Sequence, residues 1–211
     1  MVLLGGRTTS GTYPADAWIL QPSLQWGTGG GVSGGVFAAS AAYDPAIGAL
    51  VVFGGLVGNG SEISDITLTW TSPTSGWVQQ SPAASPPEMY FASMDYDTAL
   101  GGLVVFGGLV NGEQLDGTWV YNDNTWTNQA PAASPPARSV AAMAFDPVSA
   151  SLLLYGGNDN DDPAYGTDLS DTWVFRTPGT LAQTGADSDT VFIGTLVMVG
   201  PAGIEPATEG L

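Results

Sequence analysis

The chain contains no cysteine and no histidine. Disulfides, zinc fingers, thiol nucleophiles and Ser-His-Asp triads are therefore excluded, because each of them needs one of these residues. Carboxylate and carbonyl oxygens are left as metal ligands, and they suit calcium or magnesium rather than copper, iron or zinc. We accordingly expect no cofactor.

Basic side chains are almost missing. Lysine is absent, the only arginines are Arg7, Arg138 and Arg176, and twenty acidic residues give a formal net charge of -17. Such a surface repels phosphate backbones and anionic lipid headgroups, so a nucleic-acid partner is not expected. The simplest interpretation of the acidity is solubility in water.

Long apolar runs are also missing. No internal stretch reaches the roughly eighteen apolar residues that a membrane-spanning helix needs. The first residues, 1–6, are too short an apolar run and lack the basic start of a signal peptide. Thirty glycines and fifteen prolines predict many turns and short strands instead.

An internal repeat organises most of the sequence. In three places an aspartate stands ten residues before a glycine pair that ends an apolar run, and a shortened copy opens the chain. The glycine pairs recur at intervals of 49, 53 and 49 residues. They are Gly5-Gly6, Gly54-Gly55, Gly107-Gly108 and Gly156-Gly157. A period this regular predicts a fold built from repeated units.

Tryptophans recur in the same frame. One follows each glycine pair: Trp18, Trp70, Trp119 and Trp173. Three units carry a second one seven or eight residues later: Trp26, Trp77 and Trp126. Because residues that recur in every unit usually belong to the core, we interpret these tryptophans as packing residues rather than a sugar-stacking surface.

Each unit predicts four short strands. The first is small and apolar and ends in an aspartate that starts a tight turn. The second is apolar on both faces and ends in the glycine pair, where positive φ or close backbone approach is needed. The two tryptophan strands follow. One such sheet cannot bury both faces alone, so successive sheets must stack with aromatic side chains between them.

Together, the period near fifty, the apolar strand that ends in Gly-Gly and the paired tryptophans resemble the Kelch repeat. The resemblance implies an all-β fold, a β-propeller of four-stranded blades that is incomplete, with about 3.5 blades in this chain. Residues 1–176 would form a partial blade (1–30), two blades (36–80 and 89–129) and a partial blade (138–176).

The two partial blades have different gaps. The first unit lacks its first strand, and the last lacks a fourth strand, which an upstream segment could donate. The alternative is a genuine four-blade protein with ragged ends. Arg138 stands where Kelch repeats often carry arginine, so we expect a structural hydrogen-bond donor, whose equivalent in the previous unit is Met89 or a neighbour.

The tail, residues 177–211, resembles a linker followed by a sortase signal and an apolar stretch. The five signal residues are Leu181, Ala182, Gln183, Thr184 and Gly185. The resemblance implies cleavage after Thr184, attachment to the cell envelope by sortase, an extracellular location and no membrane insertion of the mature form. Residues 200–211 are acidic rather than basic, unlike such signals. A chance match in a disordered tail is the alternative.

A weak calcium candidate lies after the last glycine pair, at Asp159, Asp161 and Asp162. The spacing of these oxygens resembles a calcium loop, but its glycine and final glutamate are missing. An ordinary solvated loop is the simpler interpretation.

The predicted function is a surface binding or adhesion module rather than an enzyme. Protein or glycan would be recognised by the connectors between the second and third strands, which gather on one face in Kelch propellers. A carbohydrate-active enzyme or galactose-oxidase-like domain is the alternative, although the cysteine and histidine of that copper site are absent. A truncated product without autonomous function is another.

Overall fold

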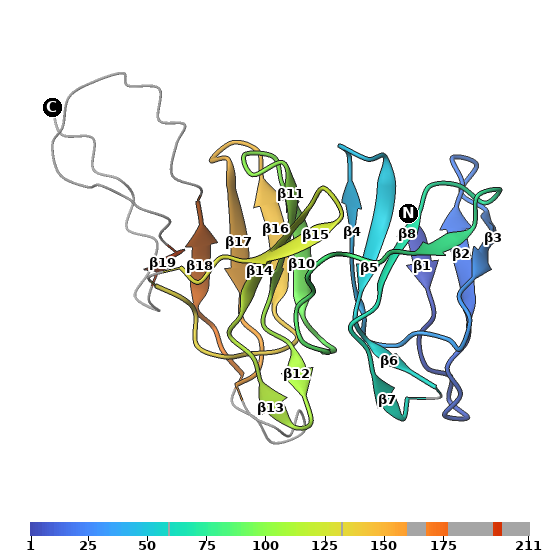
Figure 1. The fold of residues 1–211 in the computed structure, drawn as a ribbon, viewed down its shortest axis with the longest axis horizontal. Helices are drawn as coiled ribbons and strands as arrows, with labels where there is room; N and C mark the ends of the chain where they lie inside the picture. Colours follow the sequence, from blue (N-terminus) through green and yellow to red (C-terminus); the bar gives the residue numbers. More distant parts are fainter. Residues whose placement is uncertain (59, 132, 160–167, 177–195, 200–211) are drawn as a thin grey trace, which may run out of the picture.

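A computed structural model describes the chain apart from residues 59, 132, 160–167, 177–195 and 200–211. The described residues form an all-β fold without helices, which confirms the predicted fold class at this level. Four antiparallel sheets of three or four strands, here called sheets 1 to 4, follow one another in chain order along the long axis (Figure 1).

Within each sheet, the strands that are neighbours in the sheet are also consecutive among that sheet's strands along the chain. Sheet 1 contains β1 (Val2–Leu4), β2 (Asp16–Leu20) and β3 (Trp26–Gly31). Sheet 2 contains β4 (Ser40–Asp44), β5 (Ala49–Phe53), β8 (Thr67–Trp70) and β9 (Trp77–Gln79). Sheet 3 contains β10 (Ser93–Asp97), β11 (Gly102–Phe106), β14 (Thr118–Asn122) and β15 (Thr125–Asn128).

Sheet 4 contains β16 (Ala142–Asp146), β17 (Ser151–Tyr155), β18 (Thr172–Phe175) and β19 (Leu196–Val199). The sequence predicts three strands for this unit, up to residue 176, and the described residues add β19 as a fourth. The backbone of β19 pairs antiparallel with β18, from Thr172↔Val199 to Phe175↔Leu196. A short apolar segment satisfies the open edge of β18 without any tryptophan, which is why the repeat pattern does not reveal it.

The first strands of consecutive sheets lie against one another, β10 between β4 and β16. Two equivalent hydroxyls link them: Ser40 Oγ donates to the Ala92 carbonyl at 2.8 Å, and Ser93 Oγ donates to the Ala141 carbonyl at 2.7 Å. The contact between sheets therefore repeats from one unit to the next, as the sequence period predicts.

The glycine pairs join neighbouring units, which explains why no side chain is present there. The first glycines have φ between 60° and 71°, and the second between 95° and 118°. Gly55 N donates to the Met89 carbonyl at 2.8 Å, and Gly108 N donates to the Arg138 carbonyl at 2.9 Å. A Cβ on Gly107 would stand 2.3 Å from that same Arg138 carbonyl oxygen. Positive φ and close backbone approach are thus both required.

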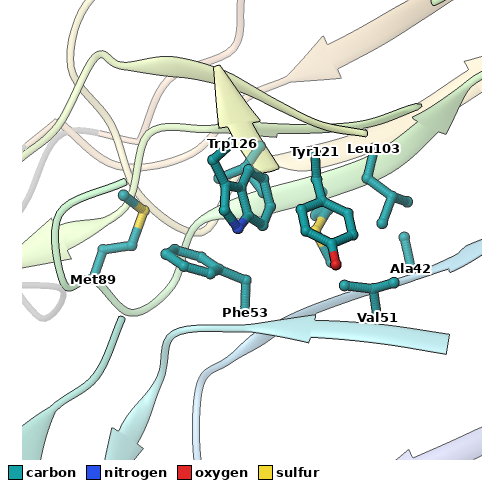
Figure 2. Close-up of a cluster of buried hydrophobic side chains, with 9 residues drawn as sticks. Ala42, Val51, Phe53, Met89, Leu103, Tyr121 and Trp126 are labelled. Carbon is teal, nitrogen blue, oxygen red and sulfur yellow. The ribbon is translucent and has the colours of Figure 1, made fainter. Parts of the chain in front are cut away.

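Two buried clusters fill the spaces between sheets 2 and 3 and between sheets 3 and 4. In the first cluster Trp126 lies between Phe53 and Tyr121, with ring centroids 4.8 and 4.9 Å away (Figure 2). Val51 and Leu103, both fully buried, complete this part of the cluster. The interpretation of the recurring aromatic residues as packing residues is correct here.

The strand register corrects the alignment of one tryptophan. Trp119 pairs with Val105 in sheet 3, and the equivalent partner in sheet 2, Val52, pairs with Leu68. Trp70 stands two residues later, at the position that Tyr121 occupies in sheet 3. Because a shift of two residues keeps the side chain on the same face of a strand, the sequence frame tolerates the change.

A hydrogen bond between a tryptophan and a threonine connects sheets 2 and 3. The Trp126 indole N–H donates to Thr67 Oγ1 at 3.0 Å, and Trp126 is only 2% exposed. The equivalent tryptophan of sheet 2 is Trp77, because Trp77 pairs with Trp70 as Trp126 pairs with Tyr121. The residue of sheet 1 equivalent to Thr67 is Ala17, which has no hydroxyl.

Where one partner of this hydrogen bond is missing in the described part of the chain, the other is left as a buried polar atom without a partner. The Trp77 indole nitrogen is buried without a hydrogen-bond partner among the described residues. The same holds for Thr118 Oγ1 in sheet 3, the equivalent of Thr67. A tryptophan partner for Thr118 would come from sheet 4, but the equivalent register position there, opposite Phe175, is Leu196. We call the tryptophan–threonine pair the interlock: it is complete between sheets 2 and 3, and half of it is missing at the other two junctions.

Candidate functional site

The connectors between the second and third strands of sheets 2 and 3 are ordered hairpins, which the sequence does not predict. They are formed by β6 (Leu56–Val57) with β7 (Glu62–Ile63) and by β12 (Leu109–Val110) with β13 (Glu113–Gln114). Figure 1 shows both hairpins projecting from the same end of the sheets, here called the loop end. Their gathering at one end agrees with the expectation for the predicted binding connectors.

Backbone hydrogen bonds fix the connectors to the glycine pairs. Ser64 N and Leu115 N donate to the carbonyls of Gly55 and Gly108, both at 2.9 Å. In sheet 4, Leu169 N donates to the Gly157 carbonyl at 2.8 Å. The loop end is therefore a set of connectors held in equivalent positions on a rigid scaffold, the arrangement in which binding residues are commonly found.

Just before the first strands of sheets 2, 3 and 4, three residues that are not glycine have left-handed backbone conformations. Ala38, Phe91 and Val140 occupy equivalent positions just before the first strands, with φ of 58°, 58° and 51°. They are linked in a row, because Phe91 N donates to the Ala38 carbonyl at 2.8 Å and Val140 N donates to the Phe91 carbonyl at 2.9 Å. A left-handed backbone is strained at a bulky residue such as Phe91 and at a β-branched residue such as Val140. Strain of this kind is typical of functional sites.

Four aromatic side chains lie at or next to this row. Tyr13 contacts Phe37 with centroids 5.4 Å apart, Phe37 contacts Phe91 at 5.9 Å, and Tyr90 contacts Phe91 at 5.2 Å. All four side chains are partly exposed. The sequence reasoning missed them. The signal that could have found them is an apolar or aromatic pair, Phe37-Ala38 and Tyr90-Phe91, at the same place in two units.

Exposed carboxylates lie on the connectors. They are Glu62, Asp65, Glu113, Asp116 and Asp168. With so few cations in the chain, the loop end disfavours anionic ligands and favours neutral or basic ones.

Arg138 is the one arginine that is buried among the described residues, at 1% exposure. Its guanidinium binds both carboxylate oxygens of Asp171, at 2.6 and 2.9 Å, and donates to the Gly156 carbonyl at 2.9 Å. This hydrogen bonding from Arg138, helped by the Trp173 indole, lowers the pKa of Asp171 below its ordinary value. The expected structural role of Arg138 is confirmed, and Met89 is its equivalent, because their carbonyls accept from Gly108 and Gly55 respectively.

The remaining predicted residues fall in different places. Trp119 is partly buried and Trp173 buried in the clusters, while Trp18 and Trp26 are 42% and 49% exposed on sheet 1. Within the described part of the chain, no group of three acidic side chains could hold a metal ion. Asp159 is exposed, whereas Asp161 and Asp162 lie outside the described residues, as does the whole sortase signal, 181–185.

No helix in the described part of the chain has the length and hydrophobicity to cross a membrane. No family model matches the sequence. No curated protein matches it significantly.

Solved structures do match, 144 chains in all. One is the structure of YjhT, with a TM-score of 0.62 and 14% sequence identity. The match covers 79% of this chain and 50% of the YjhT chain, so this chain spans about half of that protein's length. At this identity the likeness shows a shared fold.

Proposed function

We propose that the chain is a binding module of a Kelch-type β-propeller, whose four sheets are blades, and that its loop end holds the ligand. The regular period, the consecutive strand order and the contacts between the first strands of neighbouring sheets support the propeller. The same proposal includes an extracellular location, with the chain attached to the cell envelope through Thr184 by sortase.

The observation that carries the binding function is the partly exposed aromatic row, Tyr13, Phe37, Phe91 and Tyr90, held beside a strained backbone row. Aromatic faces beside convergent polar groups are the usual composition of a ligand site. The exposed carboxylates of the connectors make the ligand a neutral glycan or a basic protein surface. A carboxylate-only hydrolase would need two acids placed across one bond, and the aromatic row offers binding surface instead.

The test measures binding of the full chain to a panel of neutral oligosaccharides and to basic proteins. Phe37→Ala with Tyr90→Ala is expected to weaken glycan binding at least about tenfold, because stacking area is lost. Glu62→Gln with Glu113→Gln is expected to weaken binding of a basic protein and to reduce its salt dependence. Ile47→Ala, in a turn at the opposite end and 51% exposed, is the control. Binding that neither pair of variants changes would contradict the proposed site.

The envelope attachment has a separate test. Incubation of the chain with sortase and an amine acceptor is expected to cleave it after Thr184 and to attach the acceptor there, which mass spectrometry detects. Thr184→Ala should prevent both. Failure of the unaltered chain to react would remove the anchor from the proposal and leave the binding module in place.

A further inference from the structure

The two end sheets of the described structure each expose an apolar face. On sheet 1, Leu3 is 55%, Trp18 42% and Trp26 49% exposed. On sheet 4, Tyr155 is 55% and Leu153 36% exposed. Neighbouring large apolar side chains on one face are a common mark of an interaction surface.

The strand register shows that these two faces correspond to the two sides of an internal junction. Between sheets 2 and 3, sheet 2 contributes Phe53 and Thr67, and sheet 3 contributes Trp126. This junction is therefore a template for what each end face accepts.

Sheet 4 repeats the accepting side of the template. Phe53 pairs with Thr67 in sheet 2, and at the same register Tyr155 pairs with Thr172 in sheet 4. Thr172 is half-buried, with no further sheet against it among the described residues. Gly54 and Gly107, the first glycines of sheets 2 and 3, each lie against a carbonyl of the following unit, and among the described residues Gly156 has no such neighbour.

Sheet 1 repeats the inserting side. Trp26 pairs with Leu20 as Trp126 pairs with Tyr121, so Trp26 has the register of the interlock tryptophan. Unlike Trp126, which is 2% exposed, Trp26 has no preceding sheet to cover it among the described residues.

We propose that a second copy of the chain covers these faces head to tail, with Trp26 of one copy packed on Tyr155 and donating its indole N–H to Thr172 of the other. One chain carries both complementary faces, so a two-fold pair satisfies both at once. The match to about half of the YjhT chain agrees with a fold of this kind continuing over twice the length. The net charge of -17 on each copy opposes the association, so salt should strengthen it.

Sedimentation velocity of the full chain over a range of concentrations tests the proposal. A concentration-dependent dimer is expected, and higher salt should shift it toward lower concentrations. Trp26→Ala is expected to weaken association at least about tenfold, because a central aromatic anchor is removed. Tyr155→Ala with Thr172→Val should do the same from the other side. Val148→Ala, 94% exposed and in a turn, is the control.

Mixing separates the head-to-tail arrangement from any other. The Trp26→Ala copy keeps an intact sheet 4 face, and the Tyr155→Ala, Thr172→Val copy keeps an intact sheet 1 face. Each variant alone should be monomeric, and their mixture should form a heterodimer through the one intact junction. A chain that stays monomeric at every concentration, an oligomer unaffected by Trp26→Ala, or a mixture without heterodimer would overturn the proposal. Circular dichroism of each variant shows that it is folded.

Discussion

The junction between sheets 2 and 3 and the junction between sheets 1 and 2 come from the same repeat but are filled differently. In the first, Trp126 is buried, stacked on Phe53 and hydrogen-bonded to Thr67. In the second, Ala17 stands at the register position of Thr67, the Trp77 indole nitrogen has no partner among the described residues, and a hollow of about 210 Å³ lies beside Trp77.

This difference separates two roles of the repeat. The three sheets at these two junctions all have their strands in chain order. Sheet formation therefore depends on the apolar strands and glycine pairs that every unit has. The quality of the junction depends on two further positions, one tryptophan and one threonine, that must both be present. The comparison therefore predicts large costs where the complete junction is altered and small or opposite effects at its incomplete counterparts.

Removing the buried tryptophan should have the largest effect. Trp126→Ala is expected to lower the free energy of unfolding by about 4–5 kcal/mol, since it empties a packed site and leaves Thr67 without its donor. Trp26→Ala, at the same register but 49% exposed, should cost less than about 1 kcal/mol in dilute protein. Urea unfolding followed by circular dichroism measures both. Similar costs for the two variants would contradict the comparison.

The glycine that contacts the next unit should come second. Gly107→Ala is expected to cost about 3–4 kcal/mol, because a left-handed alanine is strained and its Cβ meets the Arg138 carbonyl. Gly101 has nearly the same φ, 65° against 71°, but has no atom within 4 Å of an added Cβ. Gly101→Ala should therefore cost only about 1–2 kcal/mol. Equal losses would mean that the approach of the next unit does not matter.

Breaking the ion pair in sheet 4 should cost less. Asp171→Asn is expected to lower stability by about 2–3 kcal/mol, below the range for a fully buried pair because the Asp171 side chain is 19% exposed. The pKa of Asp171 is lowered in the folded state, so its contribution is present above the ordinary carboxyl value of 3.8 and is lost as the pH falls through the folded value.

The pH dependence supplies the control for this pair. The unaltered chain should lose more stability on acidification than Asp171→Asn does, as measured by urea unfolding at neutral and acidic pH. Asp146→Asn is the control variant. It also removes a carboxyl group whose pKa is lowered, mainly by the hydrogen bond from Ser149, but this group lies away from the ion pair. Identical acid losses in the chain and in Asp171→Asn would show that the pair does not carry the effect.

The sequence predicts the all-β fold and its local elements well and the junctions poorly. The glycine pairs, the turn aspartates and the apolar second strands can be predicted because each obeys a local rule: positive φ, side-chain capping of a turn, or burial on both faces. The Asp44 carboxylate, for example, accepts from Ala46 N at 2.9 Å, and Asp146 accepts from Val148 N at the same distance.

The features that the sequence does not predict depend on contacts between residues far apart in the chain. The shift of Trp70, the fourth strand β19 and the match between Trp126 and Thr67, 59 residues apart, all require the strand register. The aromatic row is missed for the same reason, because Tyr13, Phe37 and Phe91 come from three different units. A repeat frame identifies which residues recur, whereas the structure identifies which of them meet.

The interlock gives the most direct test of this account, since one substitution can be made at two equivalent sites. Thr67→Val removes the acceptor of the Trp126 N–H and should lower the free energy of unfolding by about 1–1.5 kcal/mol. Thr118→Val removes a buried hydroxyl that has no partner among the described residues, so it should leave stability unchanged or raise it. Ala17→Thr offers Trp77 an acceptor and should raise stability slightly.

Urea unfolding of Thr67→Val and Thr118→Val, side by side, is the decisive measurement. The account predicts a loss for the first and no loss, or a gain, for the second. Equal losses at both positions would contradict it, because the threonine would then contribute to its own sheet rather than to the junction between sheets.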